Sequence, residues 1–245
     1  MNTYRAIVLG ATGAVGQNLV RELLGSPRCA GVTILTRRHS GLFDRVDGVG
    51  DGVDGVDGGP AKLSQRVVSM DDLESATAAA AQGCQVAFCT LGVGQPRKVS
   101  RDEHWKVDVE YARDFARGCQ AAGVRHLSLL GSVGADSQSK NRYLRVKGCA
   151  EEAVRDAGLA RVSWFRPSLL VTDEIRYGLQ DRVTQFVFPL LSWMLPRRFH
   201  QIRVGDLGRA MRINAEQPAG EPVEVLYYPD FVARLGLEPR GGEDR

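Results

Sequence analysis

Tyr143 and Lys147 stand four residues apart in a stretch with helical periodicity, and Ser132 follows the apolar run Leu127–Leu130. Residues four apart lie on one face of a helix, so the phenol and the ammonium become neighbours. A phenol by itself is a poor acid–base group at neutral pH, and a nearby ammonium favours its ionised form. Such a tyrosine can give a proton to a carbonyl oxygen or take one from an alcohol, while a serine hydroxyl holds that oxygen. These residue types therefore predict proton-transfer chemistry on a carbonyl or an alcohol.

The start of the chain predicts the element that would hold a cofactor beside these groups. The apolar run Ala6–Leu9 meets three glycines spaced three apart, and a helical pattern follows from Gln17. The first glycine permits a sharp turn, the second lets the backbone approach a phosphate, and the third lets the helix pack on the strand. The N–H groups and the positive end of that helix favour a pyrophosphate. We expect a dinucleotide site formed by Gly10, Ala11, Thr12, Gly13, Ala14, Val15 and Gly16.

The end of the second expected strand bears on which nucleotide is bound. An acidic residue there usually holds the ribose 2′-hydroxyl of NAD, but this strand ends in Thr36-Arg37-Arg38 and no carboxylate lies between residues 33 and 40. A guanidinium is suited to a phosphate, so Arg37 and Arg38 favour NADP through its 2′-phosphate. The alternative is that both are solvated surface arginines.

Strand and helix patterns alternate along most of the chain. Strands are expected at 31–36, 65–69, 85–91, 126–130 and 162–165, and helices at 70–82, 101–122 and 143–157. Alternation of this kind predicts an α/β fold with a doubly wound parallel sheet of the Rossmann type. In such a sheet Ser132 falls at the edge where ligands bind. The order of glycine turn, strand-end serine and Tyr143–Lys147 helix favours catalysis over the alternative of an exposed helix pair.

Two segments interrupt the alternation within what we expect to be a single domain, residues 1–245. Residues 44–60 repeat Val-Asp-Gly and hold few large apolar groups, which predicts a mobile surface insertion. The alternation weakens after Pro167, and we expect residues 168–222 to form a small substrate-side region ahead of a late strand at 223–228. Its large apolar residues are most simply interpreted as part of the hydrophobic core. The alternative is that they line an apolar substrate pocket or form a docking surface. They are Phe186, Phe188, Leu191, Trp193 and Met194.

Bulk composition narrows the class of protein. The 245 residues carry a net charge of +3, with 43% apolar and 25% charged residues, and this favours a globular domain without a nucleic-acid partner. Five cysteines without zinc spacing predict free thiols in a reducing compartment and no metal site. The N-terminus enters the first strand directly, leaving no room for a signal peptide, and the apolar stretch 186–195 is too short to span a bilayer. We expect a cytoplasmic protein with no transmembrane segment.

Several motifs together resemble a known family. They are Gly10-Ala-Thr-Gly-Ala-Val-Gly16, Phe88-Cys-Thr-Leu-Gly92, Leu129-Leu-Gly-Ser-Val-Gly-Ala-Asp136, Tyr143-Leu-Arg-Val-Lys-Gly148 and Phe165-Arg-Pro-Ser168. In this order they resemble the short-chain dehydrogenase/reductase superfamily, atypical class, and the Tat-interacting-protein-like oxidoreductase branch within it. The resemblance covers about residues 5 to 170.

The resemblance implies roles for individual residues. Ser132, Tyr143 and Lys147 match the family's catalytic residues, and Lys147 would also hold the nicotinamide ribose. Leu91 and Gly92 would line the cofactor site, and Pro167, Ser168 and Leu169 would lie beside the nicotinamide carboxamide. Substrate specificity would lie in residues 94–100, in residues 133–142 and after Pro167.

Two positions depart from the family pattern. Asp108 stands where related enzymes often carry an asparagine, so the resemblance does not supply a complete proton relay. Ser69 stands where an aspartate near the adenine is common, which would weaken that contact.

Two functions follow as hypotheses. The first is an NADP-dependent oxidoreductase that transfers a hydride between nicotinamide and a small carbonyl or alcohol substrate, with the intact Ser132, Tyr143 and Lys147 in its favour. The second is an NADPH-binding regulatory or scaffold protein with a protein partner and little or no turnover. The branch resemblance raises this second hypothesis, and the Asp108 departure favours it.

Overall fold

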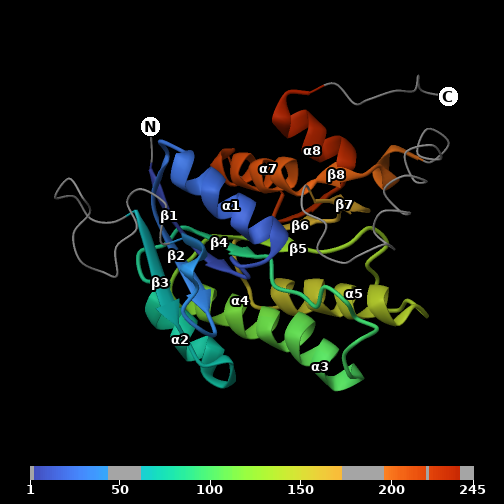
Figure 1. The fold of residues 1–245 in the computed structure, drawn as a ribbon, viewed down its shortest axis with the longest axis horizontal. Coiled ribbons are helices and arrows are strands. Elements are labelled where there is room, and N and C mark those ends of the chain that lie inside the picture. Colours follow the sequence, from blue (N-terminus) through green and yellow to red (C-terminus); the bar gives the residue numbers. More distant parts are fainter. Residues whose placement is uncertain (1–2, 44–61, 173–195, 219–220, 238–245) are drawn as a thin grey trace.

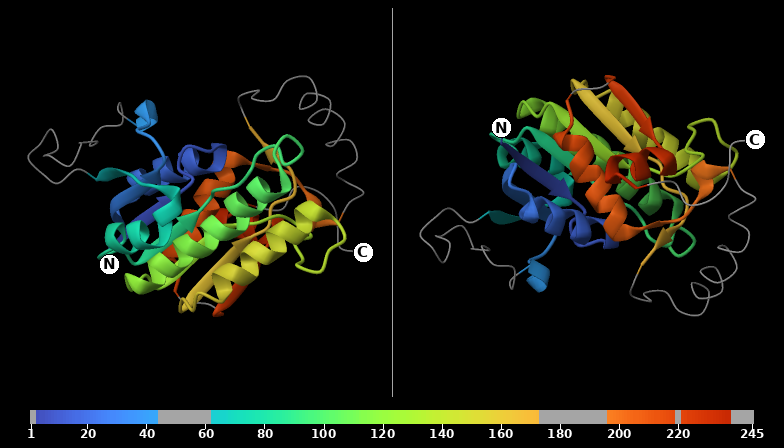
Figure 2. Two further views of the ribbon diagram at one scale, coloured as in Figure 1. Left: turned by 90° about the horizontal axis from the view of Figure 1, so that it is seen from below. Right: turned by 90° about the horizontal axis from the view of Figure 1, so that it is seen from above.

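Seven parallel strands form the central sheet of the computed structural model, which describes residues 3–43, 62–172, 196–218 and 221–237. The strand order is β3-β2-β1-β4-β5-β6-β9. Helices α1, α7 and α8 cover one face, and α2, α4 and α5 cover the other (Figure 1, Figure 2). The predicted α/β class with a doubly wound parallel sheet is therefore confirmed.

The element bounds agree with most of the expected strands and helices. The sheet contains β1 (Tyr4–Leu9), β2 (Cys29–Thr36), β3 (Leu63–Val67), β4 (Val86–Cys89), β5 (His126–Leu130), β6 (Arg161–Phe165) and β9 (Val223–Leu226). A separate parallel pair joins β7 (Leu170–Val171) to β8 (Ile202–Arg203). The helices are α1 (Ala14–Gly25), α2 (Leu73–Ala80), α3 (Arg101–Trp105), α4 (Tyr111–Ala121), α5 (Arg142–Arg155), α7 (Val204–Glu216) and α8 (Tyr228–Leu235).

Strand β1 shows why the centre of the sheet is apolar on both sides. Ala6 and Val8 join the apolar core beneath α1 and α7, whereas Ile7 and Leu9 join the core beneath α2 and α4. All four side chains are buried, because a parallel strand flanked by helices has no solvent face. The sequence shows this as a continuous apolar run.

The strand order sets the place of the site. Strands β1 and β4 are neighbours, and the chain runs outward from them in opposite directions, through β2 and β3 on one side and through β5, β6 and β9 on the other. A crevice opens at such a switch point, at the carboxyl ends of the strands. Gly10, Thr90 and Gly131 follow β1, β4 and β5, so they meet at this edge.

Three expectations need correction. The helix expected at 101–122 contains a π-helical turn, Lys106–Glu110, between α3 and α4. The strand expected at 65–69 lies at 63–67, because its register is fixed by pairing with β2, and Ser69 instead caps the next turn through the Asp71 N–H. The late strand ends at Leu226, and the chain then turns into α8.

Some expectations fall on residues that the structure does not describe. The predicted insertion at 44–60 lies outside the described residues, and so do residues 173–195 and 219–220 of the predicted substrate-side region. Within the described part of that region, α7 packs against α1 and continues the alternation of helix and strand. None of the described helices is long and apolar enough to cross a bilayer. All five cysteines are free thiols, as expected.

A buried polar network joins β5, β6 and β9 at the edge of the sheet away from the site. The Ser163 hydroxyl donates to Glu224 Oε2 at 2.7 Å, so Ser163 Oγ accepts from His126 Nε2 at 2.8 Å and from Asn214 Nδ2 at 3.0 Å. The Arg161 guanidinium lies 3.0 Å from both Glu224 carboxylate oxygens. Burial, with Arg161 acting in the same direction, lowers the pKa of His126 to about 3. The imidazole is therefore a neutral donor in the folded protein.

This network predicts an acid-sensitive fold. The unfolded chain protonates His126 below about pH 6.5, while the folded protein does not until about pH 3, so stability falls as the pH falls through that window. Between about pH 7.5 and pH 5 the loss from this group is roughly 2 kcal/mol, at ~1.4 kcal/mol per pH unit. His126→Gln keeps a donor for Ser163 and removes the titration. Urea unfolding at both pH values measures the difference, and an unchanged pH dependence in the variant would contradict this interpretation.

Candidate functional site

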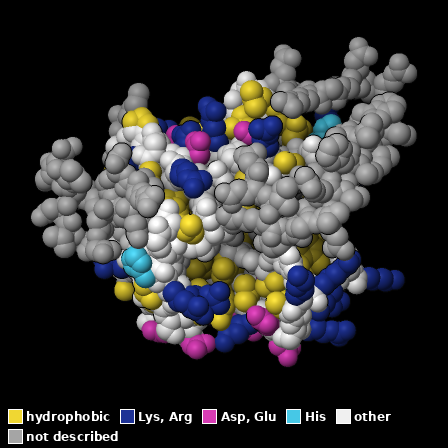
Figure 3. Space-filling model, in the orientation of Figure 1, with side chains coloured by type: hydrophobic (Ala, Val, Ile, Leu, Met, Phe, Trp, Pro, Cys, Tyr) yellow, Lys and Arg dark blue, Asp and Glu magenta, His cyan; other side chains and the backbone are white. Residues whose placement is uncertain are grey.

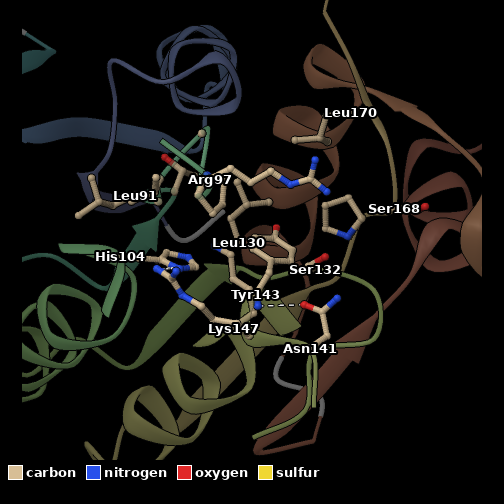
Figure 4. A pocket seen from close by; sticks show the side chains of 18 residues that line it. Leu91, Arg97, His104, Leu130, Ser132, Asn141, Tyr143, Lys147, Ser168 and Leu170 are labelled. Atoms are coloured by element: carbon tan, nitrogen blue, oxygen red, sulfur yellow. Dashed lines mark hydrogen bonds between the residues drawn. The ribbon is translucent and has the colours of Figure 1, made fainter. Parts of the chain in front are cut away.

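A cavity of about 710 Å³ opens at the carboxyl edge of the sheet, between the ends of β4, β5 and β6 and the start of α5 (Figure 4). Its walls come from the segments that follow β4, β5 and β6 and from helices α3 and α5. The lining residues are Thr90, Leu91, Gly92, Val93, Gly94, Pro96, Arg97, His104, Leu130, Gly131, Ser132, Asn141, Arg142, Tyr143, Lys147, Pro167, Ser168 and Leu170.

The glycine turn lies beside this cavity and has the form that a dinucleotide requires. Gly10 has φ +89°, and a Cβ there would lie 2.4 Å from the Leu91 nitrogen. A Cβ on Gly16 would lie 2.2 Å from the Gly10 oxygen, so α1 can begin this close to β1 only with glycine. The Thr90 hydroxyl donates to the Gly10 oxygen at 3.1 Å and fixes the turn to β4.

The N-terminus of α1 fits an anionic group. Among the residues that the structure describes no side chain caps it, and its first turn carries no acidic residue. The first amides of a helix lack acceptors within the helix, so those of Ala14, Val15 and Gly16 are available to a ligand. Gly13 is exposed, and a Cβ there would meet only the Gly10 oxygen, at 3.3 Å. The residues present therefore fit the pyrophosphate of a dinucleotide.

Ser132 lies on the loop after β5, and this loop is tied to the loop after β6. The Gly131 N–H donates to the Phe165 oxygen at 2.8 Å, and the Val133 N–H donates to the Pro167 oxygen at 2.9 Å. Ser132 is buried, and among the described residues its hydroxyl donates only to the Val133 oxygen, at 3.3 Å. These bonds hold the hydroxyl at the cavity wall, where its long bond to the Val133 oxygen can be exchanged for one to a bound oxygen.

Helix α5 brings Tyr143 and Lys147 to the same cavity. Asn141 caps the helix by accepting from the Tyr143 N–H at 2.9 Å, the bond drawn in Figure 4. One turn further, a Cβ on Gly148 would lie 2.2 Å from the Ser137 nitrogen. The helix therefore packs directly on the loop that carries Ser132, and this contact fixes the Tyr143 side of the cavity relative to the Ser132 side.

Asp108 holds the amine of Lys147. Asp108 Oδ1 lies 2.7 Å from Lys147 Nζ, and Oδ2 accepts from the Val93 N–H at 2.9 Å. Both side chains are nearly inaccessible to solvent, at 1% and 11% exposure. Burial by itself lowers the pKa of Lys147, but the adjacent Asp108 carboxylate and, after it, Tyr143 act in the opposite direction, and the net pKa of the ammonium is raised. Lys147 is therefore a fixed cation with a direct counter-charge.

His104 forms the wall next to Tyr143. Its ring stacks on the Tyr143 ring with centroids 6.2 Å apart and planes 8° from parallel. The Arg142 guanidinium lies 3.5 Å from His104 Nδ1, and because a guanidinium only donates, Nδ1 accepts and Nε2 carries the proton. Nε2 points toward Asp108 at 3.9 Å without a hydrogen bond. Burial, together with the Arg142 and Lys147 cations, lowers the pKa of His104 against the effect of Asp108, so the imidazole is neutral.

Some of the predicted site residues meet in the cavity and others do not. Lining it are Leu91, Gly92, Ser132, Tyr143, Lys147, Pro167 and Ser168. The glycine turn, Leu169, Arg37 and Arg38 lie outside the lining. Arg37 and Arg38 are exposed just after β2, and within the described residues neither forms an ion pair. The predicted specificity segments contribute Gly94, Pro96, Arg97, Asn141, Arg142 and Leu170 to the wall.

The sequence did not single out His104 or Thr90, and it gave Asp108 no partner. His104 and Asp108 are four residues apart, which places them on one helix face. That spacing, followed by the asparagine cap before Tyr143, was the only sequence feature that could have pointed to His104 and Asp108 as site residues. Their contacts with Tyr143 and Lys147 are evident only from the packing of α3 and the following turn against α5.

Comparison with known proteins shows which family the chain belongs to. A family model described as NAD(P)H-binding matches residues 10–186. Protein HTATIP2 of Rattus norvegicus is 31% identical over 228 residues, covering 92% of this chain and 87% of the rat protein. Protein fmp52, mitochondrial, of Emericella nidulans is 25% identical over 244 residues, covering 92% of this chain and 96% of the fungal protein.

Solved structures share the fold. A short-chain dehydrogenase/reductase superfamily protein from Agrobacterium tumefaciens with bound NAD superposes with a TM-score of 0.63 at 18% identity, covering 96% of this chain and 84% of that one. MoeE5 in complex with UDP-glucuronic acid and NAD gives a TM-score of 0.65 at 16% identity, with coverages of 96% and 83%. These matches confirm the resemblance expected from the motifs. The chain belongs to the NAD(P)H-binding family, with the rat protein HTATIP2 among its relatives.

Proposed function

We propose that the protein is an NADP-dependent oxidoreductase that acts on a carbonyl or alcohol group. The observation that carries this proposal is the cavity in which Ser132, Tyr143 and Lys147 meet beside the uncapped N-terminus of α1. A dinucleotide held at that terminus would supply or accept the hydride. The protein would then need to orient the substrate oxygen and to move one proton, and the cavity offers a group for each task.

Each residue has a distinct part in this proposal. Ser132 donates a hydrogen bond to the substrate oxygen, and Tyr143 gives that oxygen its proton during reduction or takes it during oxidation. Lys147 keeps a positive charge near the phenol and offers donors to the cofactor ribose. Asp108 holds the Lys147 amine in place. Leu91, Gly92 and Ser168 bound the space for the nicotinamide ring.

A second candidate is an NADPH-binding regulatory or scaffold protein. One observation favours it: Lys147 is already bound by a buried carboxylate, so one of its donors is taken. Turnover separates the two candidates. The purified protein is incubated with NADPH and a panel of aldehydes and ketones, and loss of NADPH absorbance is followed. Reduction of a panel member supports the oxidoreductase, whereas tight NADPH binding without any turnover supports the scaffold.

We expect NADPH to bind more tightly than NADH. Arg37 and Arg38 follow β2, which pairs with β1 beside the glycine turn, and neither has an ion-pair partner among the described residues to lose. Contact with a 2′-phosphate would be charge-assisted, so replacing both by alanine should cost roughly 1–3 kcal/mol of NADPH binding and leave NADH binding unchanged. Fluorescence titration of both nucleotides measures this. Equal affinities in the wild type would contradict the preference.

A further inference from the structure

The charges around the cavity are unbalanced. Its described lining contains Arg97, Arg142 and Lys147 but no aspartate or glutamate. Lys147 is neutralised by Asp108, which lies behind the wall. Two guanidinium groups therefore face the cavity without a lining carboxylate to balance them. On the face drawn in Figure 3, Lys and Arg side chains lie on both sides of an area of apolar side chains.

Arg97 has no structural task among the described residues. It extends from the loop after β4 into the cavity toward Leu170 (Figure 4) and forms no ion pair or side-chain hydrogen bond in the described part of the chain. A guanidinium carries five N–H donors, and none of those of Arg97 is taken by a described residue.

Arg142 is held in place and only partly used. Its Nη2 donates to the Ser100 oxygen at 3.1 Å and lies 3.5 Å from His104 Nδ1. Its Nε and Nη1 have no partner within the described residues. His104 is fully buried and supports the guanidinium from behind. Arg142 is thus a preorganised cation next to Tyr143, while Asn141 adds a neutral amide to the same wall.

We propose that the substrate carries an anionic oxygen group, a carboxylate or a phosphate, which Arg97 and Arg142 bind while its carbonyl or alcohol meets Ser132 and Tyr143. This inference rests on the proposed oxidoreductase function and names its substrate class. Planar guanidinium groups match carboxylate and phosphate oxygens through paired, charge-assisted hydrogen bonds. A neutral apolar substrate would leave both cations of the wall without a counter-charge.

The test separates binding from turnover. Benzoate, phenyl phosphate and neutral methyl benzoate are titrated by calorimetry into the NADPH-loaded protein. In parallel, 4-carboxybenzaldehyde, 4-formylphenyl phosphate and the methyl ester of the former are offered as substrates. We expect the anions to bind at least about tenfold more tightly than the ester, with the same order in kcat/KM. The tighter of the two anions identifies the group as carboxylate or phosphate.

Matched variants assign the effect to the two arginines. Arg97→Gln and Arg142→Gln should each weaken anion binding by about tenfold or more and leave methyl benzoate unchanged. Lys98→Gln and Arg145→Gln remove the same charge from neighbouring exposed positions outside the cavity and should change neither. Because Arg97 has no described partner to lose, its variant remains informative even where Arg142→Gln affects folding.

The outcomes distinguish this inference from the function on which it rests. Anion binding without reduction of any aldehyde would refute the oxidoreductase and leave the anion site standing. Equal binding of anions and ester, or variants that behave like the controls, would overturn the anion site. A loss of NADPH affinity as large as the loss of anion affinity would assign the arginines to the cofactor and overturn it as well.

Discussion

Replacing Tyr143 by phenylalanine is expected to lower turnover by roughly 10²–10⁴-fold, the usual contribution of general acid–base catalysis, with little change in NADPH binding. The substitution removes one hydroxyl and keeps the ring that stacks on His104 and the helix cap at Asn141. The cavity wall should therefore persist while proton transfer is lost. Steady-state kinetics on a reduced carbonyl compound, with NADPH affinity from fluorescence titration, measure both parts.

Tyr111→Phe is a matched control for this variant. Tyr111 is the first residue of α4 and lies outside the cavity lining, so its hydroxyl should not affect turnover. Lys147→Ala should differ from both, because it removes a charge near the phenol and a donor for the ribose, so cofactor affinity should fall together with turnover. Turnover by Tyr143→Phe at the wild-type rate would show that the proposed proton donor is wrong.

Replacing Asp108 by alanine is expected to destabilise the folded protein by about 3–5 kcal/mol, the usual cost of removing one partner of a buried ion pair. Lys147 would keep its burial and lose its counter-charge, and the Val93 N–H would lose its acceptor. Asp108→Asn should cost less, because the amide oxygen can still accept from Val93. Urea denaturation of the two variants against the wild type measures both losses.

Asp71→Ala is the matched control, because it removes one partner of an exposed ion pair. Asp71 lies 3.0 Å from Lys106, with side chains 82% and 48% exposed, so solvent screens the pair and its loss should have little effect on stability. The double variant Asp108→Ala/Lys147→Met should recover part of the stability, since no unpaired buried charge remains. If Asp108→Ala costs no more than Asp71→Ala, the buried pair does not stabilise the fold as inferred.

The sequence by itself determined the class of fold and pointed to the sheet edge where the candidate site lies. Apolar runs alternating with helical patterns require buried parallel strands, and glycine at positions 10, 13 and 16 marks the first turn. Strand β5 was predicted at its observed bounds, His126–Leu130, where three leucines supply the apolar pattern. These features are local, so local patterns reveal them.

The region after Pro167 shows where local patterns are insufficient. Helix α7 carries glycines at 205 and 208, which weaken its helical pattern, yet a Cβ on Gly208 would lie 2.8 Å from the Leu19 nitrogen of α1. Glycine is required there by the neighbouring helix, and the sequence contains no sign of that neighbour. The π-helical turn around Asp108 is equally invisible to a 3.6-residue periodicity.

The candidate site likewise combines features that the sequence shows with contacts that only the tertiary structure creates. The types and spacing of Tyr143 and Lys147 predicted a proton-transfer pair from one helix, because residues four apart share a face. The partners of that pair come from another part of the chain, Asp108 and His104, and the loop after β4 adds Arg97 to the cavity that the pair lines. Contacts between elements depend on packing, and packing is decided when the whole sheet is assembled. The sequence therefore determined which reaction to expect, and only the tertiary structure decided the charge balance of the cavity in which it would occur.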